Sequence, residues 1–221
     1  MPCVRFAKMP IFHPASAAVV SYEVLLRQCG DLNLNDFNQN PHLFHQYHHQ
    51  LINQLRELDL AGKIRSRGQK LFINLLPQQL ASSQAMEAIQ ALHRPPHYPL
   101  VIEITEGELS TEPADMLASL NPIRTSGCQL AIDDFGYGHS NFYRLLEFSP
   151  QIIKLDQAFI QADNRQESRR MQLKQLISLF HHWQKEVIIE GVESKEQYSL
   201  SQWLGADYVQ GYYFGKPEMI E

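Results

Sequence analysis

Apolar and polar residues form short segments along the chain, and their spacing changes between that of a strand and that of a helix. Two strands are predicted near the N-terminus, at Val4–Phe12 and Val19–Leu26, and the short, proline-containing His13–Ser16 between them suits a hairpin. The polar segment Cys29–Pro41 is predicted to be a loop. Apolar residues then recur at steps of three and four from Pro41 to Leu58, which predicts a helix.

From residue 70 onwards, strand-like and helix-like segments alternate. The predicted strands are Lys70–Leu75, Leu100–Thr105, Gln129–Asp134, Ile152–Asp156, Val187–Glu190 and Tyr208–Tyr213. The predicted helices between them are Gln78–Leu92, Glu112–Ser126, Asn141–Phe148, Arg165–Trp183 and Lys195–Leu204. This alternation is typical of a parallel sheet with right-handed crossovers. With about eight strand candidates it favours a single domain over residues 1–221, an α/β TIM-type (β/α)8 barrel with one antiparallel strand near the N-terminus.

Composition narrows the possible partners and compartments. The formal net charge is −5 and no run of Lys or Arg occurs, which argues against a surface for duplex nucleic acid. The three cysteines are far apart, odd in number and form no CxxC motif, as expected of a reduced, cytoplasmic protein without a disulfide framework or a zinc site. We predict no signal peptide and no membrane span, because no window approaches the roughly 18 apolar residues that a span needs.

Polar side chains interrupt the predicted strands at or near their C-terminal ends. They are Asn74, Glu103, Asp133, Asp134, Lys154, Glu190 and Gln210, joined by Glu23 if the second strand begins the parallel series. In a TIM-type barrel this rim carries the active site. Each residue also has an ordinary structural explanation, since Asn74 could cap a helix and Glu103 could pair with Lys154. Their shared position on one rim indicates a functional site instead.

The chemistry of this set is coherent. The five carboxylates and the carboxamide of Asn74 are hard oxygen donors, which suit Mg²⁺ or Mn²⁺ rather than zinc or copper. Two such ions roughly 3.5–4 Å apart can activate water and stabilise the leaving oxygen in phosphodiester hydrolysis. Lys154 could add positive charge beside the phosphate. His45, His48 and His49 share a predicted helix, and for these we favour a solvated face over a metal site.

The motifs resemble, in order, those of the EAL domain, a bacterial phosphodiesterase that opens cyclic di-GMP to linear pGpG. The signature Glu-Ala-Leu corresponds to Glu23-Val-Leu25, followed by Arg27. The other matching segments are Phe72-Ile-Asn74 with Pro77, Glu103-Ile-Thr-Glu106, Asp133-Asp-Phe-Gly136, Lys154-Leu-Asp156, Glu190-Gly-Val-Glu193 and Val209-Gln-Gly211. The match covers nearly the whole chain. It implies a stand-alone EAL domain in second-messenger signalling, of the kind that controls biofilm formation and motility.

The resemblance also implies roles for individual residues. One metal ion would be held by Glu23, Asn74, Glu103 and Asp133, and a second by Asp133, Asp134 and Glu190. Lys154 would contact the nucleophilic water or the phosphate, and Arg27, Gln210, Leu26 and Pro77 would lie against the substrate. Glu106 would tether the loop after Asp134, and Glu193 would support the site. Mg²⁺ or Mn²⁺ would be the cofactor, Ca²⁺ would inhibit, and the protein would be a homodimer.

The sequence departs from the family pattern in places. Val24 replaces the alanine of the signature, and Tyr137-Gly-His-Ser-Asn141 stands where the family usually has Thr-Gly-Tyr-Ser-Ser. Two other interpretations remain. The chain could be a catalytically weak regulator that binds cyclic di-GMP or a protein partner, or a barrel hydrolase that acts on another phosphodiester. Because every expected metal ligand is present, we favour the enzyme.

Overall fold

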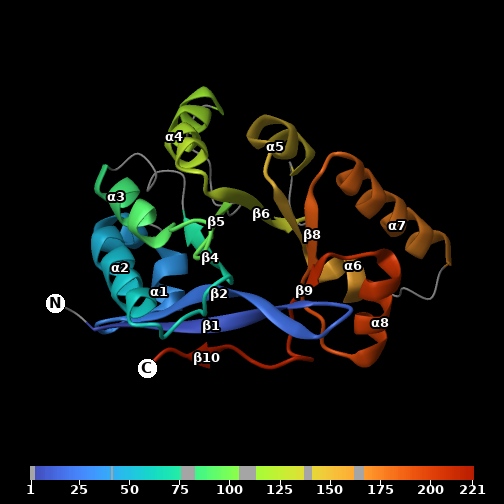
Figure 1. Ribbon diagram of the computed structural model, residues 1–221, viewed down its shortest axis with the longest axis horizontal. Helices are drawn as coiled ribbons and strands as arrows, with labels where there is room; N and C mark the ends of the chain where they lie inside the picture. The colour runs from blue at the N-terminus through green and yellow to red at the C-terminus, as the bar shows by residue number, and fades with distance from the viewer. Residues whose placement is uncertain (1–2, 41, 76–82, 105–112, 137–140, 162–166) are drawn as a thin grey trace. The chain divides into compact units, whose positions relative to one another are not determined.

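The computed structural model describes residues 3–40, 42–75, 83–104, 113–136, 141–161 and 167–221 (Figure 1). The strands are β1 (Val4–His13), β2 (Ala18–Cys29), β3 (Leu32–Asn33), β4 (Lys70–Leu75), β5 (Leu100–Ile104), β6 (Gln129–Phe135), β7 (Ile152–Leu155), β8 (Glu186–Ile189), β9 (Tyr208–Val209) and β10 (Glu218–Met219). The helices are α1 (Leu34–Gln39), α2 (His42–Leu60), α3 (Ser83–Leu92), α4 (Pro113–Ser126), α5 (Asn141–Phe148), α6 (Ala158–Gln161), α7 (Glu167–His182) and α8 (Lys195–Leu204).

The chain forms two compact units. The first comprises Met1–Met9, Ser21–Gln129 and Pro217–Glu221, and the second comprises Pro10–Val20 and Leu130–Lys216. The hairpin of β1 and β2 contributes residues to both units, because the division falls within each of its strands. Each unit is therefore built from the hairpin and from its own series of strands and helices.

In the first unit, β4 lies between β2 and β5 and is parallel to both. The register pairs Glu23 of β2 with Phe72 of β4, and Asn74 of β4 with Glu103 of β5. Helices α2 and α3 pack side by side, as Figure 1 shows. The buried apolar side chains of this unit include Phe37, Leu51, Leu55, Ile64, Leu71, Ile89, Leu92 and Leu100. The helical spacing of Leu51 and Leu55 predicted this burial.

The first unit also contains three ion-paired side chains, Asp59, Arg65 and Arg94, which we call the arginine cluster. Arg65 holds Asp59 in a bidentate pair, with Nε–Oδ1 at 2.9 Å and Nη2–Oδ2 at 3.1 Å, and Arg94 Nη2 lies 2.6 Å from Oδ2. Arg65 also donates to the carbonyl oxygens of Leu92, at 2.8 Å, and Pro99. The cluster thus joins α2, the end of α3 and the segment that leads into β5.

His93 is buried beside this cluster. Its Nδ1 accepts a hydrogen bond of 3.1 Å from the backbone N–H of Leu100, at the start of β5. Burial lowers the pKa of His93 below its usual 6.5, and the nearby charge of Arg65 lowers the pKa further. The ring is therefore held neutral, with Nδ1 acting as an acceptor.

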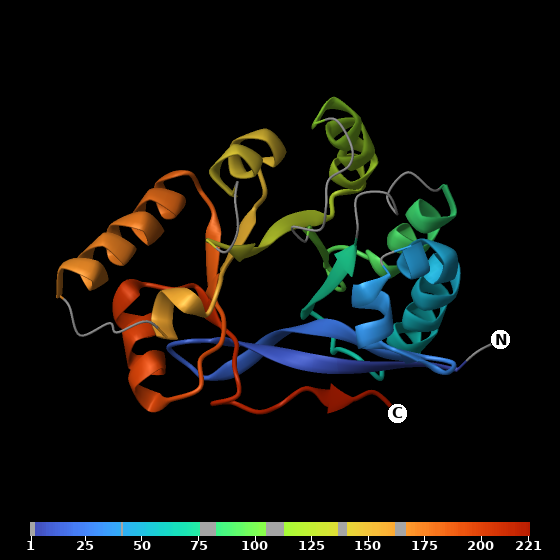
Figure 2. The same ribbon diagram turned by 180° about the vertical axis from the view of Figure 1, so that it is seen from behind.

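In the second unit, β6, β7, β8 and β9 are successive parallel neighbours. The end of β1 pairs with β9 in the opposite direction, with Phe12 beside Val209. Apolar side chains of these strands pack with those of α7 and α8, including Phe180 and Leu204, in one cluster. Figures 1 and 2 show α7 and α8 on the same side of β8. Burial of both strand faces explains the short apolar runs in the sequence.

The structure confirms most of the predicted elements. The hairpin is present, closed by a 2.9 Å hydrogen bond from Ala17 N to His13 O. The antiparallel strand is β1, since it runs against β9 and β10, whereas β2 is parallel to β4. No helix in the described parts of the chain has both the length and the apolar character needed to cross a bilayer.

Other predictions were wrong in detail. The segment Cys29–Pro41 is not a loop throughout, because it contains β3 and α1. Asn33 begins α1 with a capping box, in which its side chain accepts from the N–H groups of Asn35 and Asp36, and the Asp36 carboxylate accepts from Asn33 N. This Asn-x-x-Asp spacing was the signal in the sequence. The short elements α6 and β10 were also missed, because a single turn and a two-residue strand leave little periodicity to detect.

The final predicted strand, Tyr208–Tyr213, is shorter than expected, because β9 ends at Val209. The backbone then turns at Gly211, whose φ is +158° and where an added Cβ would lie 2.1 Å from Val192 O. Tyr213 N donates to the same carbonyl oxygen at 2.9 Å. This close approach of two backbones requires glycine and ends the strand early.

Candidate active site

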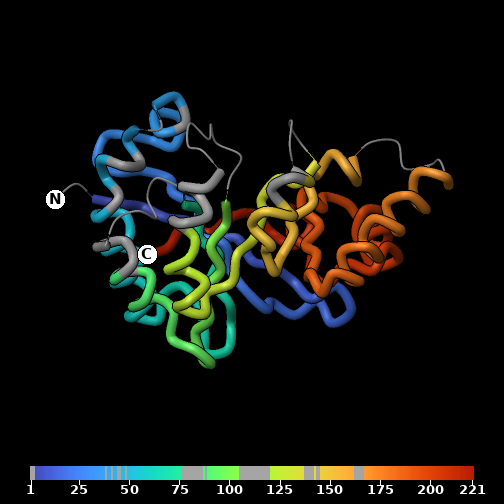
Figure 3. The backbone as a smooth tube through the Cα atoms, turned by 90° about the horizontal axis from the view of Figure 1, so that it is seen from above, coloured from blue at the N-terminus to red at the C-terminus, as the bar shows by residue number. Residues whose placement is uncertain are grey.

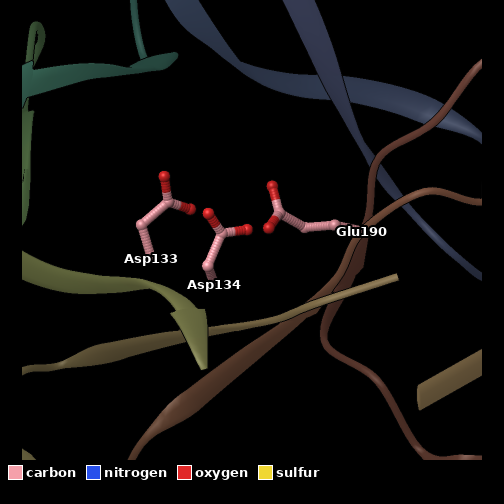
Figure 4. Close-up of side chains that lie close together, drawn as sticks. All are labelled: Asp133, Asp134 and Glu190. Carbon is pink, nitrogen blue, oxygen red and sulfur yellow. The ribbon is translucent and has the colours of Figure 1, made fainter. Parts of the chain in front are cut away.

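Three carboxylates of the second unit meet at the C-terminal ends of their strands. Asp133 and Asp134 lie at the end of β6, and Glu190 follows the last residue of β8. One oxygen of each lies within 4.8 Å of the others, and Figure 4 shows the three side chains pointing toward one another. With Lys154 of β7 they form what we call the carboxylate cluster. The predicted convergence of strand ends is thus observed for these residues.

A distortion of β6 brings its two neighbouring aspartates to the same place. Consecutive side chains of a regular strand point to opposite faces. Here the register between β6 and β7 shifts between Ile132 and Phe135, and Asp134 has a positive φ of 51°. Aspartate tolerates this left-handed conformation better than most residues, and irregular strand segments often redirect side chains next to active sites. Both carboxylates consequently reach Glu190.

Lys154 is the buried cation of the carboxylate cluster. Its side chain is 1% exposed, and Nζ lies 2.8 Å from Asp133 Oδ1 and 2.9 Å from Glu190 Oε1. Asp133 and Glu190 are thus partners of Lys154 within the second unit, and the pairing of Lys154 with Glu103, considered from the sequence, stays a prediction. A buried ammonium needs such partners because its desolvation is costly.

The charges of the carboxylate cluster favour a bound cation. Lys154 pairs with Asp133 and Glu190, and the third carboxylate, Asp134, adds negative charge within a few ångströms of them. Ligands of Mg²⁺ lie about 2.0–2.1 Å from the ion, so oxygens on opposite sides of it are about 4 Å apart. The separations within the cluster are compatible with that arrangement. Asp133, Asp134 and Glu190 therefore fit a hard divalent ion such as Mg²⁺ or Mn²⁺.

Glu23, Asn74 and Glu103 form a second group of predicted ligands, in the first unit. Asn74 Nδ2 donates to Glu23 Oε1 at 3.1 Å, and Glu103 is fully buried beside Asn74 in the strand register. The carbonyl oxygen of Asn74 is buried and accepts no hydrogen bond from any residue that the structure describes. Buried carbonyl oxygens usually have a partner, and a metal ion would supply one. This group therefore also fits the predicted cofactor.

The residues predicted to contact the substrate or support the site differ in their burial and in the side of the strand on which they lie. Arg27 is partly buried on β2 and shares the Glu23 side of that strand, whereas alternation puts Leu26 on the opposite side. Gln210 is buried directly after β9, with its backbone N–H bonded to Ile189 O at 3.0 Å. Glu193 has an exposed side chain, and its backbone N–H donates to Gln197 Oε1 near the start of α8.

Several predicted features lie outside the described residues. These are Pro77, Glu106 and the loop residues from Tyr137 to Ser140. In α2, nothing is described of the side chains of His45 and His48, while His49 is exposed. Their predicted roles stay predictions.

The sequence analysis assigned no role to Phe159 or Gln157, yet both contact the backbone of the site. A Cβ added to Gly136 would lie 2.0 Å from Phe159 Cε2, and one added to Gly191 would lie 2.3 Å from Gln157 Cβ. Phe159 and Gln157 therefore pack against the turns that follow Asp134 and Glu190. The glycines next to acidic residues were the signal in the sequence, but their contacts could be found only in the structure.

Comparison with known proteins identifies the family. A family model described as the EAL domain matches residues 6–217. The chain belongs to the EAL domain family. Among curated proteins, this EAL domain is 36% identical to the cyclic di-GMP phosphodiesterase RocR of Pseudomonas aeruginosa over 188 residues, 83% of this chain and 47% of RocR. It is 26% identical to the cyclic di-GMP phosphodiesterase PdeF of Escherichia coli K12 over 217 residues, 91% of this chain and 28% of PdeF. The chain thus spans less than half the length of these relatives.

Solved structures confirm the fold class. The manganese and cyclic di-GMP complex of Klebsiella pneumoniae BlrP1 matches with a TM-score of 0.78 at 28% identity, over 99% of this chain and 59% of that chain. BlrP1 is also known as a calcium and cyclic di-GMP complex. An EAL domain protein of Listeria monocytogenes matches with a TM-score of 0.75 at 26% identity, over 96% of this chain and 87% of that chain. The TIM-type barrel with an antiparallel strand near the N-terminus, predicted from the sequence, is the fold of this EAL domain.

Proposed function

We propose that this EAL domain hydrolyses one phosphodiester bond of cyclic di-GMP and releases linear pGpG, with two Mg²⁺ or Mn²⁺ ions as cofactor. The observation that carries the proposal is the carboxylate cluster, where Asp133, Asp134 and Glu190 converge around the buried Lys154. The names of RocR and BlrP1 support cyclic di-GMP as the substrate, since each is a family relative described with that molecule.

The residues of the site would either bind the metal ions or stabilise charge on the phosphate. Asp133, Asp134 and Glu190 would hold one ion, and Glu23, Asn74 and Glu103 would complete the ligands of the other, with Asp133 shared. Bound metal ions would supply an activated water and stabilise the leaving oxygen of the ribose. Lys154 fixes Asp133 and Glu190 through its two ion pairs and adds positive charge where the phosphate develops negative charge.

The substrate would be positioned by residues around these ligands. Arg27, on the Glu23 side of β2, offers a guanidinium for a phosphate oxygen. Gln210 would close the polar ring next to Glu190, and Leu26, Pro77, Glu106 and Glu193 keep their predicted supporting roles. The described cysteines are all free thiols, which supports the reduced cytoplasm as the working compartment.

We also propose a homodimer that uses α5. Phe142 and Leu146 lie one turn apart on this helix and are 49% and 67% exposed, a pair of large apolar side chains that a second copy would cover. Phe142 packs edge-on against Phe135, with ring centroids 5.5 Å apart. Phe135 directly follows Asp134, so the interface would contact the strand that carries two metal ligands.

Incubation with cyclic di-GMP, followed by chromatographic separation of the products, tests the proposal. We expect pGpG to form with Mg²⁺ or Mn²⁺, to disappear after chelation and to decrease when Ca²⁺ replaces Mg²⁺, because calcium bonds are longer and less strictly directed. Saturable binding of cyclic di-GMP without any pGpG would support the regulator instead. Cleavage of another phosphodiester, with cyclic di-GMP left intact, would overturn the choice of substrate.

A further inference from the structure

A cleft of about 510 Å³ lies between α7 and α8 of the second unit. Figure 3 shows the two helices next to one another. The residues that line the cleft are Arg170, Lys195, Glu196, Ser199, Leu200 and Trp203. The proposed catalytic chemistry uses none of them. The cleft therefore calls for an explanation that does not depend on the metal site.

Positive charge dominates this cleft, although the chain as a whole carries −5. Arg170 and Lys174 lie one turn apart on α7, and Lys195 is the first residue of α8. Neither Arg170 nor Lys195 forms an ion pair within the part of the chain that the structure describes. An acidic ligand would find these two charges available.

The acidic residue of the cleft, Glu196, offsets only part of this charge, through its electrostatic attraction to Lys195. Glu196 lies in the first turn of α8, where hydrogen bonds from its own backbone N–H and from the Ser194 hydroxyl lower the pKa of its carboxyl group. The carboxylate is thus engaged by the start of its own helix. Among the residues that line the cleft, two cations, Arg170 and Lys195, stand against the one acid, Glu196.

An exposed indole adds an apolar anchor to the charged cleft. Trp203 is 44% exposed. Leu200, about one turn before it on α8, is buried. Trp and Arg are the residue types most enriched among the energetically dominant contacts of protein interfaces. The combination is typical of a surface that binds another polypeptide.

The contacts of Trp203 disfavour a nucleotide. Lys174 Nζ lies 4.1 Å from the centroid of the indole, so the ammonium covers one face of the ring on which a base would stack. An extended peptide does not need that face. Alternate residues of an extended chain are about 6.6–7 Å apart, close to the 6 Å rise between residues i and i+4 of a helix. Acidic side chains at alternate positions would therefore match Arg170 and Lys174.

We propose that the cleft between α7 and α8 binds an extended acidic segment of a partner protein, with carboxylates on Arg170, Lys174 and Lys195 and an apolar side chain against Leu200 and Trp203. The cleft is open to solvent, which suits a peptide, because small-molecule pockets bury most of their ligand. This docking surface is independent of the proposed hydrolysis of cyclic di-GMP.

A fluorescein-labelled peptide, with glutamate at alternate positions around a central leucine, serves as the probe in fluorescence anisotropy. We expect saturable binding to the wild-type chain at low ionic strength. Arg170→Glu and Trp203→Ala should each weaken binding about tenfold or more. Arg169→Glu is the matched control, because it makes the same charge change at an exposed neighbour that does not line the cleft, and it should weaken binding less than about twofold.

Two further peptides distinguish the contribution of the glutamate charges from that of the central leucine. Replacing leucine by serine should weaken binding several-fold, and replacing every glutamate by lysine should abolish it. Thermal unfolding of each variant shows that it is folded. The proposal is overturned if the acidic peptide does not bind, if Arg169→Glu weakens binding as much as Arg170→Glu, or if guanosine 5′-monophosphate binds at the cleft and displaces the peptide.

Discussion

The arginine cluster and the carboxylate cluster each surround a buried cation, Arg65 and Lys154, but their charges are balanced differently. In the arginine cluster, one carboxylate, Asp59, receives two guanidiniums, and backbone carbonyl oxygens accept the remaining donors of Arg65. In the carboxylate cluster, the ammonium of Lys154 pairs with Asp133 and Glu190, and Asp134 adds a third carboxylate within 4.8 Å of theirs. The carboxylate of the first group is already held by two guanidiniums, whereas the carboxylates of the second group are suited to bind a further cation.

This difference distinguishes a charged group with a structural role from one that can bind a ligand. A carboxylate whose oxygens are held bidentately and by a second guanidinium has little capacity for another partner. Carboxylates in excess over their cation repel one another until a further cation binds. Burial alone therefore does not mark a functional site, and the ratio of acids to bases within the cluster does. The same Asp→Asn change made in each cluster tests this conclusion.

The largest expected effect is the loss of activity of Asp133→Asn. The change removes a negative charge that we assign to both metal ions, so turnover of cyclic di-GMP should fall by about 10³-fold or more. The free energy of unfolding measured without metal should fall less than in Asp59→Asn, because the buried Lys154 keeps Glu190 as a partner and the repulsion between the carboxylates is reduced. A variant that keeps a near-normal rate would place the metals elsewhere.

The matched change, Asp59→Asn, should have the opposite outcome. It leaves the buried guanidinium of Arg65 and the partly exposed guanidinium of Arg94 without their carboxylate, and losing one partner of a buried ion pair costs about 3–5 kcal/mol. Denaturant unfolding should show this loss, while the rate per folded molecule stays near that of the wild type. If Asp59→Asn lowered the rate at unchanged stability, the assignment of a structural role to this cluster would be wrong.

Metal binding should stabilise the chain through one cluster alone. A ligand at 100 times its Kd adds about 2.7 kcal/mol to the free energy of unfolding. Saturating Mg²⁺ or Mn²⁺ should therefore raise the unfolding temperature of the wild type and of Asp59→Asn by comparable amounts. The increase should be much smaller in Asp133→Asn. Equal stabilisation of all three proteins would show that the ions bind outside the carboxylate cluster.

The smallest expected effect is a pH dependence from His93, next to the arginine cluster. The pKa of this residue is lowered in the folded protein, so the unfolded chain takes up a proton near pH 6.5 that the folded chain does not. Stability should consequently fall as the pH decreases below about 7. In His93→Asn, whose side-chain oxygen can still accept from Leu100 N, the decrease between pH 7 and 5 should be shallower. Identical pH profiles would mean that His93 does not contribute.

Much of the fold followed from the sequence. The period of apolar residues set the strands and the long helices, since one buried face requires a fixed spacing in each. The residue types at the strand ends were enough to indicate a hard-cation site, because strand ends of parallel sheets meet at one edge. The sequence did not reveal the arginine cluster, whose members come from separate segments and share no motif.

The tertiary structure decided what the order of residues leaves open. Alternation along a strand would send Asp133 and Asp134 to opposite faces, and only the irregularity of β6 and the positive φ of Asp134 bring both to Glu190. The sequence did not show which carboxylates Lys154 contacts, and packing placed its ammonium beside Asp133 and Glu190. The sequence by itself determined which chemical groups are available and on which elements they lie. Their partners depended on packing, because contacts between residues distant in the chain are set by how the strands and helices assemble.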